Sequence, residues 1–431
     1  MPKWPEKQES KSTPWVCKNK LNKTLNPKAV VCFAGPRDHY EGAAALAEVG
    51  QLEQLVTDAY FSDERWVQWA PSFVRRYIKP RRHPLIPGER VTTSYRAAAY
   101  ELFGRFTVKR KQAMLNAKDQ AIGVLAAKIA ERTEAHLLAY SYYAGAAFAA
   151  PCRVRSRLLF QVHPPVTPLR SLYLEELQRE PLTRESLLAE AEMQPHLQEL
   201  ESETKAPVIA EGIICASSFT RRMLIEAGAT APIKVVPYGV DASTYHCRTT
   251  APVGRFTVAF VGAFTQRKGA LYLLRALRPL GQHVRLVIYT RATIDSALQA
   301  ELHGLEVEIK SGLSNSALAA DIARCHVMIL SSIAEGFGLA ILEAMACGVP
   351  VICTHNTGGA DVITNGQDGF VLPIRAVDGV TEILDKGLRD PELFYEIGQK
   401  ARKTVERLTW TNYRTKFAQA YRELYTETDF L

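Results

Sequence analysis

The sequence predicts an α/β protein made of two consecutive domains, each with a parallel sheet. Three observations support this fold class. The 431 residues exceed a single ordinary domain of roughly 100–200 residues. Short apolar runs alternate with helix-like stretches, which is the pattern of β-α-β units. The rhythm stops over residues 238–255, where no period is clear, and then restarts.

The first strand is the clearest element of the first half. The run Ala29–Ala34 is continuously apolar and ends before Gly35, as in a buried parallel strand. A helix-like stretch ending at Gly50 follows, and Leu172–Ala206 is acidic, rich in leucine and predicted to be helical. Further strands are predicted at Leu55–Ala59, Ala135–Tyr140, Arg157–Val162, Ile213–Ala216 and Lys234–Pro237, and in the second half at Thr257–Val261, Arg285–Tyr289, Val327–Leu330 and Val351–Cys353.

These elements suggest domain boundaries. Residues 1–27 are polar and rich in proline, and we expect a loose N-terminal arm there. A first domain is expected over 28–237, a linker over 238–255 and a second domain over 256–407.

The composition, with 47% hydrophobic and 23% charged residues, is that of an ordinary globular protein. The eight cysteines never show CxxC spacing, which argues against a zinc site or a redox dithiol. The N-terminus has no apolar signal segment, and the longest apolar stretch, Ala139–Ala150, is too short to span a bilayer. We therefore expect a cytoplasmic protein.

The formal net charge of +8 is concentrated in residues 61–111, where lysines and arginines far outnumber acids and alternate with aromatic residues. Such a segment suits peripheral contact with the anionic inner face of a membrane. Failure to co-sediment with anionic liposomes at low salt would remove this hypothesis. The alternatives are a solvated surface and a site for an acidic acceptor. We expect no nucleic acid partner, because no recognition motif accompanies the charge.

The most informative segment is Val327–Asp361. A buried strand leads into a turn with Glu335, Gly336 and Gly338, and a helix carrying Glu343 follows. Loops at the C-terminal ends of parallel strands bind ligands in open α/β sheets, and glycines before a helix let backbone amides approach an anion. Two carboxylates so placed can hold hydroxyl groups at two ends of one ligand. Alternatively, Glu343 pairs with a basic neighbour and the glycines only permit a tight turn.

A second segment, Phe256–Leu274, reads as a strand, Gly262, a polar loop and then Arg267-Lys268-Gly269 at the start of a helix. Two cations at a helix N-terminus suit a diphosphate, because converging charge-assisted hydrogen bonds strengthen the binding of an anion. A solvated basic loop is the alternative.

The residues EGFGLAILEAMACGVPVICT (335–354) resemble the E-x7-E signature of the retaining GT-B-fold glycosyltransferases of the "group 1" family. The resemblance extends to VVPYGVD (235–241), the RKG loop and LTWTNYRTKFAQAY (408–421). It implies two Rossmann-like domains facing across a cleft, with the acceptor on the first domain and the nucleotide sugar on the second. It also implies that a helix within 408–431 returns to the first domain.

The resemblance implies a role for each matching residue of the second domain. Glu343 would bind the ribose of a nucleotide-diphosphate sugar, and Glu335 would contact the donor sugar. Arg267 and Lys268 would hold the diphosphate. The donor site would be completed by the backbone of Gly262, Gly336, Phe337, Gly338 and Leu339.

The first domain would contribute from across the cleft. His163 follows the strand Arg157–Val162 and resembles a family histidine that meets the donor sugar, which makes His163 and Glu335 the catalytic candidates. A structural histidine at a strand end is the alternative. The stretch from Gly35 to Gly42 would form the acceptor-side loop.

The resemblance implies transfer of a sugar, with a hexose favoured, to a hydroxyl of a glycan, glycolipid or small molecule by a front-face mechanism without an enzyme nucleophile. The chain has no Asp-x-Asp motif, so we expect no metal and no cofactor, with cations and helix N-termini stabilising the departing diphosphate. One departure is Gly262-Ala263, where many relatives have Gly-Arg; Arg267 is expected to compensate.

Two other functions stay open: a nucleotide-sugar epimerase of the same fold, and a non-catalytic nucleotide-sugar-binding scaffold. A dehydrogenase is disfavoured because no GxGxxG follows a strand. We expect the loops Tyr289–Arg291 and Lys310–Leu313 to meet the nucleotide base, although neither identifies it.

Overall fold

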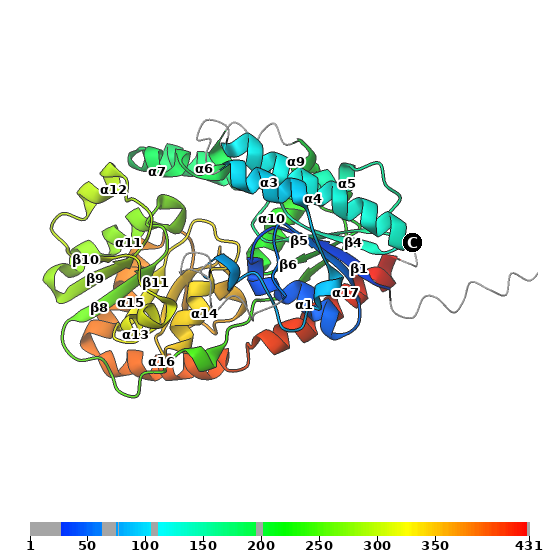
Figure 1. Ribbon diagram of the computed structural model, residues 1–431. Coiled ribbons are helices and arrows are strands. Elements are labelled where there is room, and N and C mark those ends of the chain that lie inside the picture. The colour runs from blue at the N-terminus through cyan, green and yellow to red at the C-terminus, as the bar shows by residue number, and fades with distance from the viewer. Residues whose placement is uncertain (1–26, 63–74, 76, 105–110, 195–200, 429–431) are drawn as a thin grey trace, which may run out of the picture.

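The computed structural model describes residues 27–62, 75, 77–104, 111–194 and 201–428. Two α/β domains lie side by side, with the first half of the chain in one and most of the second half in the other (Figure 1). The predicted arm at 1–27 lies outside the described residues except for Pro27.

The first domain is built on a seven-stranded parallel sheet with the order β3-β2-β1-β4-β5-β6-β7. The central strands β1 and β4 are fully buried, because helices cover both faces of a parallel sheet. The strands are β1 (Ala29–Cys32), β2 (Leu52–Thr57), β3 (Val91–Thr93), β4 (His136–Tyr140), β5 (Arg157–Gln161), β6 (Gly212–Cys215) and β7 (Ile233–Val235).

The second domain has a six-stranded parallel sheet with the order β10-β9-β8-β11-β12-β13. The buried strands β11 and β12 pair in register, with Met328 beside Val351. The strands are β8 (Phe256–Val261), β9 (Val284–Tyr289), β10 (Glu306–Lys310), β11 (Val327–Leu330), β12 (Val351–Thr354) and β13 (Phe370–Leu372). Two doubly wound parallel sheets confirm the predicted GT-B architecture.

Helices connect the strands in both domains. In the first they are α1 (Glu41–Glu48), α3 (Tyr95–Gly104), α4 (Lys111–Thr133), α5 (Ala144–Ala149), α6 (Val166–Arg179), α7 (Arg184–Leu188), α9 (Glu201–Ile209) and α10 (Ser218–Glu226). In the second they are α11 (Ala270–Leu277), α12 (Ser296–Glu301), α13 (Asn315–Ile322), α14 (Leu339–Ala346), α15 (Val377–Arg389) and α16 (Pro391–Val405).

The last helix, α17 (Trp410–Thr428), crosses back to the first domain, as predicted (Figure 1). It packs against α1 and β6. Arg414 of α17 binds both Glu41 and Glu48 of α1, at N–O distances of 2.8 Å each. Because the second domain lies between β7 and α17 in the chain, this helix closes the two domains into one unit.

The stretch Leu172–Ala206 is largely helical in its described part, as predicted, but it is not one continuous helix. The described part is broken into α6, α7 and α9, with 3₁₀ turns at Pro181–Thr183 and Ala191–Met193. Pro181 explains the first break, because proline lacks the amide that a helix interior requires. The strands β3, β10 and β13 were not predicted: β3 and β13 have only three residues each, and β10 is an exposed strand of alternating charge.

Candidate functional site

The turn that follows β11 carries Glu335 and is anchored on both sides. The Glu335 amide donates to the carbonyl of Asn356 at 3.0 Å. Phe337 is buried, packs edge-on against Tyr238 and fills the space beside Gly358. Gly338 (φ +87°) has the left-handed conformation that glycine tolerates, and Leu339 begins α14. The turn therefore holds Glu335 in a fixed position.

The RKG loop lies against the end of the same strand. Gly269 has φ +71°, and a Cβ there would stand only 1.9 Å from the carbonyl oxygen of Ser331. Only glycine permits this approach. The close contact brings Arg267 and Lys268 to the turn that carries Glu335.

Three side chains from these loops converge. The Lys268 amine lies 2.7 Å from Oε2 of Glu335, and an Arg267 guanidinium nitrogen lies 3.2 Å from the same oxygen. Burial opposes the charge on Glu335, but the two cations outweigh it and lower its pKa to about 2. Arg267 also donates through Nε to Glu190 at 2.9 Å. The site is thus a largely buried network of two basic and two acidic side chains.

His163 reaches this network from the first domain. It lines a pocket of about 130 Å³ together with Arg267, Glu335 and Gly336. A Cβ at Gly336 would lie 2.4 Å from the carbonyl oxygen of Val162, so the two domains touch here. Burial, followed by the charge of Arg37, lowers the His163 pKa to about 4, and the imidazole is therefore neutral near pH 7.

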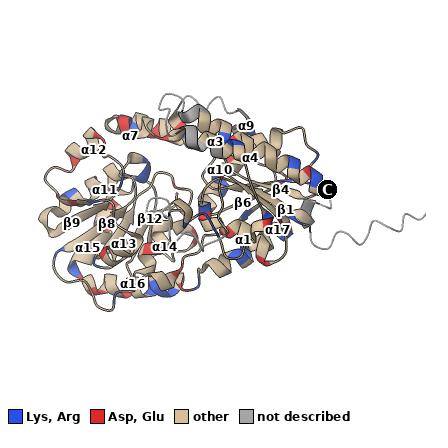
Figure 2. Ribbon diagram, in the orientation of Figure 1, with Lys and Arg blue, Asp and Glu red and all other residues tan. Residues whose placement is uncertain are grey.

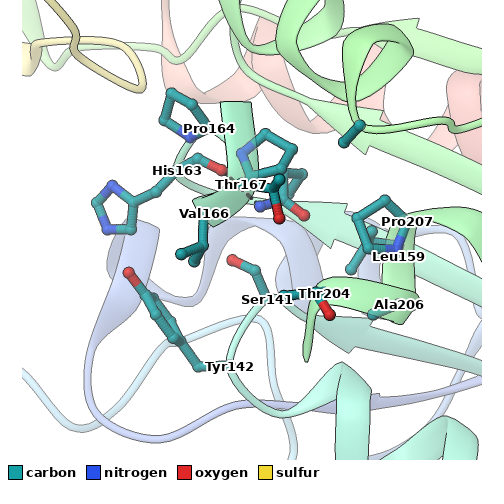
Figure 3. Close-up of a pocket in the computed structure, with 13 residues that line it drawn as sticks. Ser141, Tyr142, Leu159, His163, Pro164, Val166, Thr167, Thr204, Ala206 and Pro207 are labelled. Carbon is teal, nitrogen blue, oxygen red and sulfur yellow. Dashed lines mark hydrogen bonds between the residues drawn. The ribbon is translucent and has the colours of Figure 1, made fainter. Parts of the chain in front are cut away.

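His163 also lines a smaller hollow formed by first-domain residues. His163 and Tyr142 border it, with ring centroids 5.9 Å apart (Figure 3). Ser141 and Thr167 supply hydroxyl groups to its wall. His163 therefore faces two spaces, one shared between the domains and one formed by the first domain alone.

The second domain holds a larger pocket of about 480 Å³. It is lined by Tyr289–Ala292 and Lys310–Leu313, which include both loops predicted to meet a base, and by Gly262 and Ala263. A Cβ at Gly262 would lie 3.2 Å from the Lys268 amine. The Lys268 amine therefore stands between this pocket and the smaller one beside Glu335.

The other predicted site residues lie outside both pockets. Glu343 accepts a hydrogen bond from Tyr245, and burial raises its pKa. The Gly35 amide donates to Asp58, and the Gly42 amide donates to the buried carboxylate of Asp38. The structure thus brings together His163, Glu335, Gly336, Arg267 and Lys268 and leaves Glu343, Gly35 and Gly42 apart from them.

Sequence reasoning missed the residues that complete the smaller pocket. Its outer wall is formed by Tyr173 of α6, by Glu192 in the turn Ala191–Met193 and by Glu190 just before that turn. Pro181 is the sequence feature that could have indicated them, because a proline ends or kinks a helix. A helix that ends there allows the following residues to change direction and reach the second domain.

Charged residues of both signs are interspersed over the two domains (Figure 2). Within residues 61–111, Arg81 pairs with Asp58, and Arg90 pairs with Glu53. Much of that segment, at 63–74, 76 and 105–110, lies outside the described residues. Across the residues that the structure does describe, no helix has the length and apolarity needed to cross a membrane.

Comparisons with known proteins relate the second domain to a known family. Residues 243–404 match the family model of the glycosyl transferases group 1. This segment includes β8 through α16, and therefore both the RKG loop and the Glu335 turn. The second domain is therefore similar to the group 1 glycosyltransferases.

Among relatives, the chain is 28% identical over 220 residues to the MMP α-(1→4)-mannosyltransferase of Mycolicibacterium hassiacum, covering 48% of this chain and 53% of the relative. The chain spans about half the length of the curated relatives it matches. Among solved structures, sucrose-phosphate synthase from Thermosynechococcus elongatus aligns with a TM-score of 0.61 at 18% identity, covering 93% of this chain and 100% of that one. Anabaena HepE in complex with UDP and glucose aligns with a TM-score of 0.57 at 17% identity, covering 92% and 100%.

Proposed function

We propose that this chain is a retaining glycosyltransferase that moves a sugar from a nucleotide-diphosphate sugar to a hydroxyl group of a carbohydrate or lipid-linked acceptor. One observation carries the proposal. The Lys268 amine lies between a pocket of about 480 Å³ in the second domain and one of about 130 Å³ at the domain boundary. A nucleotide-diphosphate sugar carries its diphosphate between the base and the sugar, in the same order as the larger pocket, Lys268 and the smaller pocket.

The residues divide the donor among them. The loops around Tyr289 and Lys310 enclose the base, and Lys268 and Arg267 donate to the diphosphate. Glu335 and His163 flank the sugar from opposite domains. Glu343 is assigned to the ribose on the family resemblance alone.

The mechanism needs positioning and charge stabilisation. As the glycosidic bond to the diphosphate breaks, negative charge grows on the leaving oxygens, and the preorganised cations Arg267 and Lys268 stabilise it. Glu335 stays ionised and holds both cations in place. The acceptor hydroxyl attacks from the face that the diphosphate leaves and passes its proton to the departing phosphate. No metal or cofactor is part of this proposal.

The names of similar proteins support the substrate class. The Mycolicibacterium relative is named a mannosyltransferase, and Anabaena HepE was solved with UDP and glucose. From these two names we propose that the donor of this chain is a nucleoside diphosphate linked to a hexose. A cytoplasmic location and peripheral contact of residues 61–111 with an anionic membrane belong to the same proposal.

Calorimetric titration with UDP, GDP and ADP tests the donor site. We expect one nucleotide to bind, and Lys268→Ala and Glu343→Ala each to weaken it about tenfold or more, because each removes a direct contact. Lys403→Ala, an exposed lysine on α16, is the matched control and should bind like the wild type. If the folded protein binds none of the three nucleotides, the donor site is wrong and a scaffold is favoured.

A further inference from the structure

The pocket of about 130 Å³ has an outer wall formed by α6 and by the residues around the turn Ala191–Met193 that follows α7. The wall is fixed to the second domain by the fully buried carboxylate of Glu176. This carboxylate accepts hydrogen bonds from Gln266 (2.7 Å), Tyr272 (2.7 Å) and Arg375 (2.8 Å). Because all three donors come from the second domain, the wall is a rigid part of the site.

Tyr173 is the most informative residue of this wall. Its side chain is completely buried and lines the pocket, yet its hydroxyl has no hydrogen-bond partner among the residues that the structure describes. The phenol lies within electrostatic range of Arg267, Glu192 and Glu190. A buried hydroxyl without a partner is unfavourable, so its presence beside a pocket points to a ligand that completes the hydrogen bond.

Glu192 is the second residue of this wall with a polar group that a ligand can reach. Glu335 and Glu190 are both bonded to Arg267, whereas the Glu192 carboxylate makes no hydrogen bond to another residue within the described ranges. It accepts from its own backbone amide, and its two oxygens have further lone pairs that can accept from hydroxyl or ammonium groups. The three carboxylates of Glu190, Glu192 and Glu335 outnumber the two cations beside them, Arg267 and Lys268, so the local field opposes a further negative charge.

We infer that Tyr173 and Glu192 are specificity-determining residues that bind hydroxyl groups of the transferred sugar, and that the pocket selects a neutral or amino hexose over a hexuronic acid. This inference rests on the proposed function and deepens it. The sugar's hydroxyl groups gain binding energy by forming hydrogen bonds with the Tyr173 hydroxyl and with the Glu192 carboxylate. A hexuronic acid is disfavoured because its carboxylate is repelled by Glu192.

The test compares each nucleotide with its sugar conjugate. UDP, GDP and ADP are titrated alone and as neutral hexose conjugates into the wild type, Tyr173→Phe and Tyr272→Phe. We expect Tyr173→Phe to weaken the conjugate about tenfold and to leave the free nucleotide unchanged, because only the sugar contacts the hydroxyl. Tyr272→Phe removes one of the three bonds to Glu176 while Gln266 and Arg375 keep α6 docked, so it should leave the ratio of the two affinities unchanged.

A second arm tests charge selection. With the nucleotide that binds, Glu192→Gln should raise the affinity for the glucuronic acid conjugate about tenfold relative to the glucose conjugate. Equal affinities of Tyr173→Phe and the wild type for the conjugate, or an equal loss for conjugate and nucleotide, would overturn the inference, and so would a loss reproduced by Tyr272→Phe. If the wild type binds no nucleotide, the proposed function fails and the inference falls with it; if nucleotide binds but these differences are absent, only the inference fails.

Discussion

At the scale of the residue, His163 links the site to pH. Burial lowers its pKa from 6.5 to about 4, so the unfolded chain binds more protons than the folded one between those values. Stability therefore falls as pH drops through this window. Between pH 7 and 4 we expect the free energy of unfolding of His163→Asn to fall by about 1–2 kcal/mol less than that of the wild type. This figure is reduced because the His163 ring is partly exposed to solvent. Urea unfolding at a series of pH values measures it.

The matched control is His246→Asn, since His246 is exposed and lies in the linker region. It should leave the slope of the unfolding free energy against pH unchanged. Glu335 contributes little to the pH dependence in this range, because its pKa falls from 4.5 to about 2 on folding and its stabilising charge is lost only between those values. If His163→Asn keeps the wild-type slope, the histidine is not held neutral at the domain boundary.

At the scale of the element, the segment α6–α7 depends on one buried carboxylate. Removing Glu176 would leave Arg375, Gln266 and Tyr272 without their shared acceptor. We expect Glu176→Ala to lower the free energy of unfolding by about 3–5 kcal/mol, as for other broken buried pairs. The neighbouring Glu175 also binds Arg375 but is about half exposed, so Glu175→Ala should cost less than about 1 kcal/mol. Equal losses in urea unfolding of the two variants would contradict this account.

The same elements show what sequence could and could not predict. Strands such as Val327–Leu330 were predicted because burial on both faces demands an unbroken apolar run. The edge strand Glu306–Lys310 carries alternating charges, since one side of it meets solvent. For the candidate site, Glu335 and Lys268 lie in short local motifs, whereas Tyr173 and Glu192 reach the pocket only after Glu176 docks on Gln266, 90 residues away. Local patterns do not encode such a contact.

At the scale of the whole molecule, the contact between the domains runs through Gly336. Its carbonyl accepts from the hydroxyls of Ser217 (2.6 Å) and Thr220 (3.3 Å) of the first domain. The neighbouring Ser218 amide donates to Asp361 of the second domain at 2.8 Å. The pocket beside Glu335 therefore exists only while the domains are closed, whereas the larger pocket lies within the second domain alone.

We expect Gly336→Ala to hold the domains apart, because its Cβ would lie 2.4 Å from the carbonyl oxygen of Val162 and backbone on either side cannot yield cheaply. Small-angle scattering should show a larger radius of gyration. The affinity for a nucleotide sugar should fall about tenfold, while that for the free nucleotide stays near the wild-type value, because its contacts belong to the second domain. Gly379→Ala in α15, where a Cβ finds ordinary contacts of 3.5 Å, should change neither property. An unchanged radius with both affinities intact would mean that the closed arrangement does not form the sugar site.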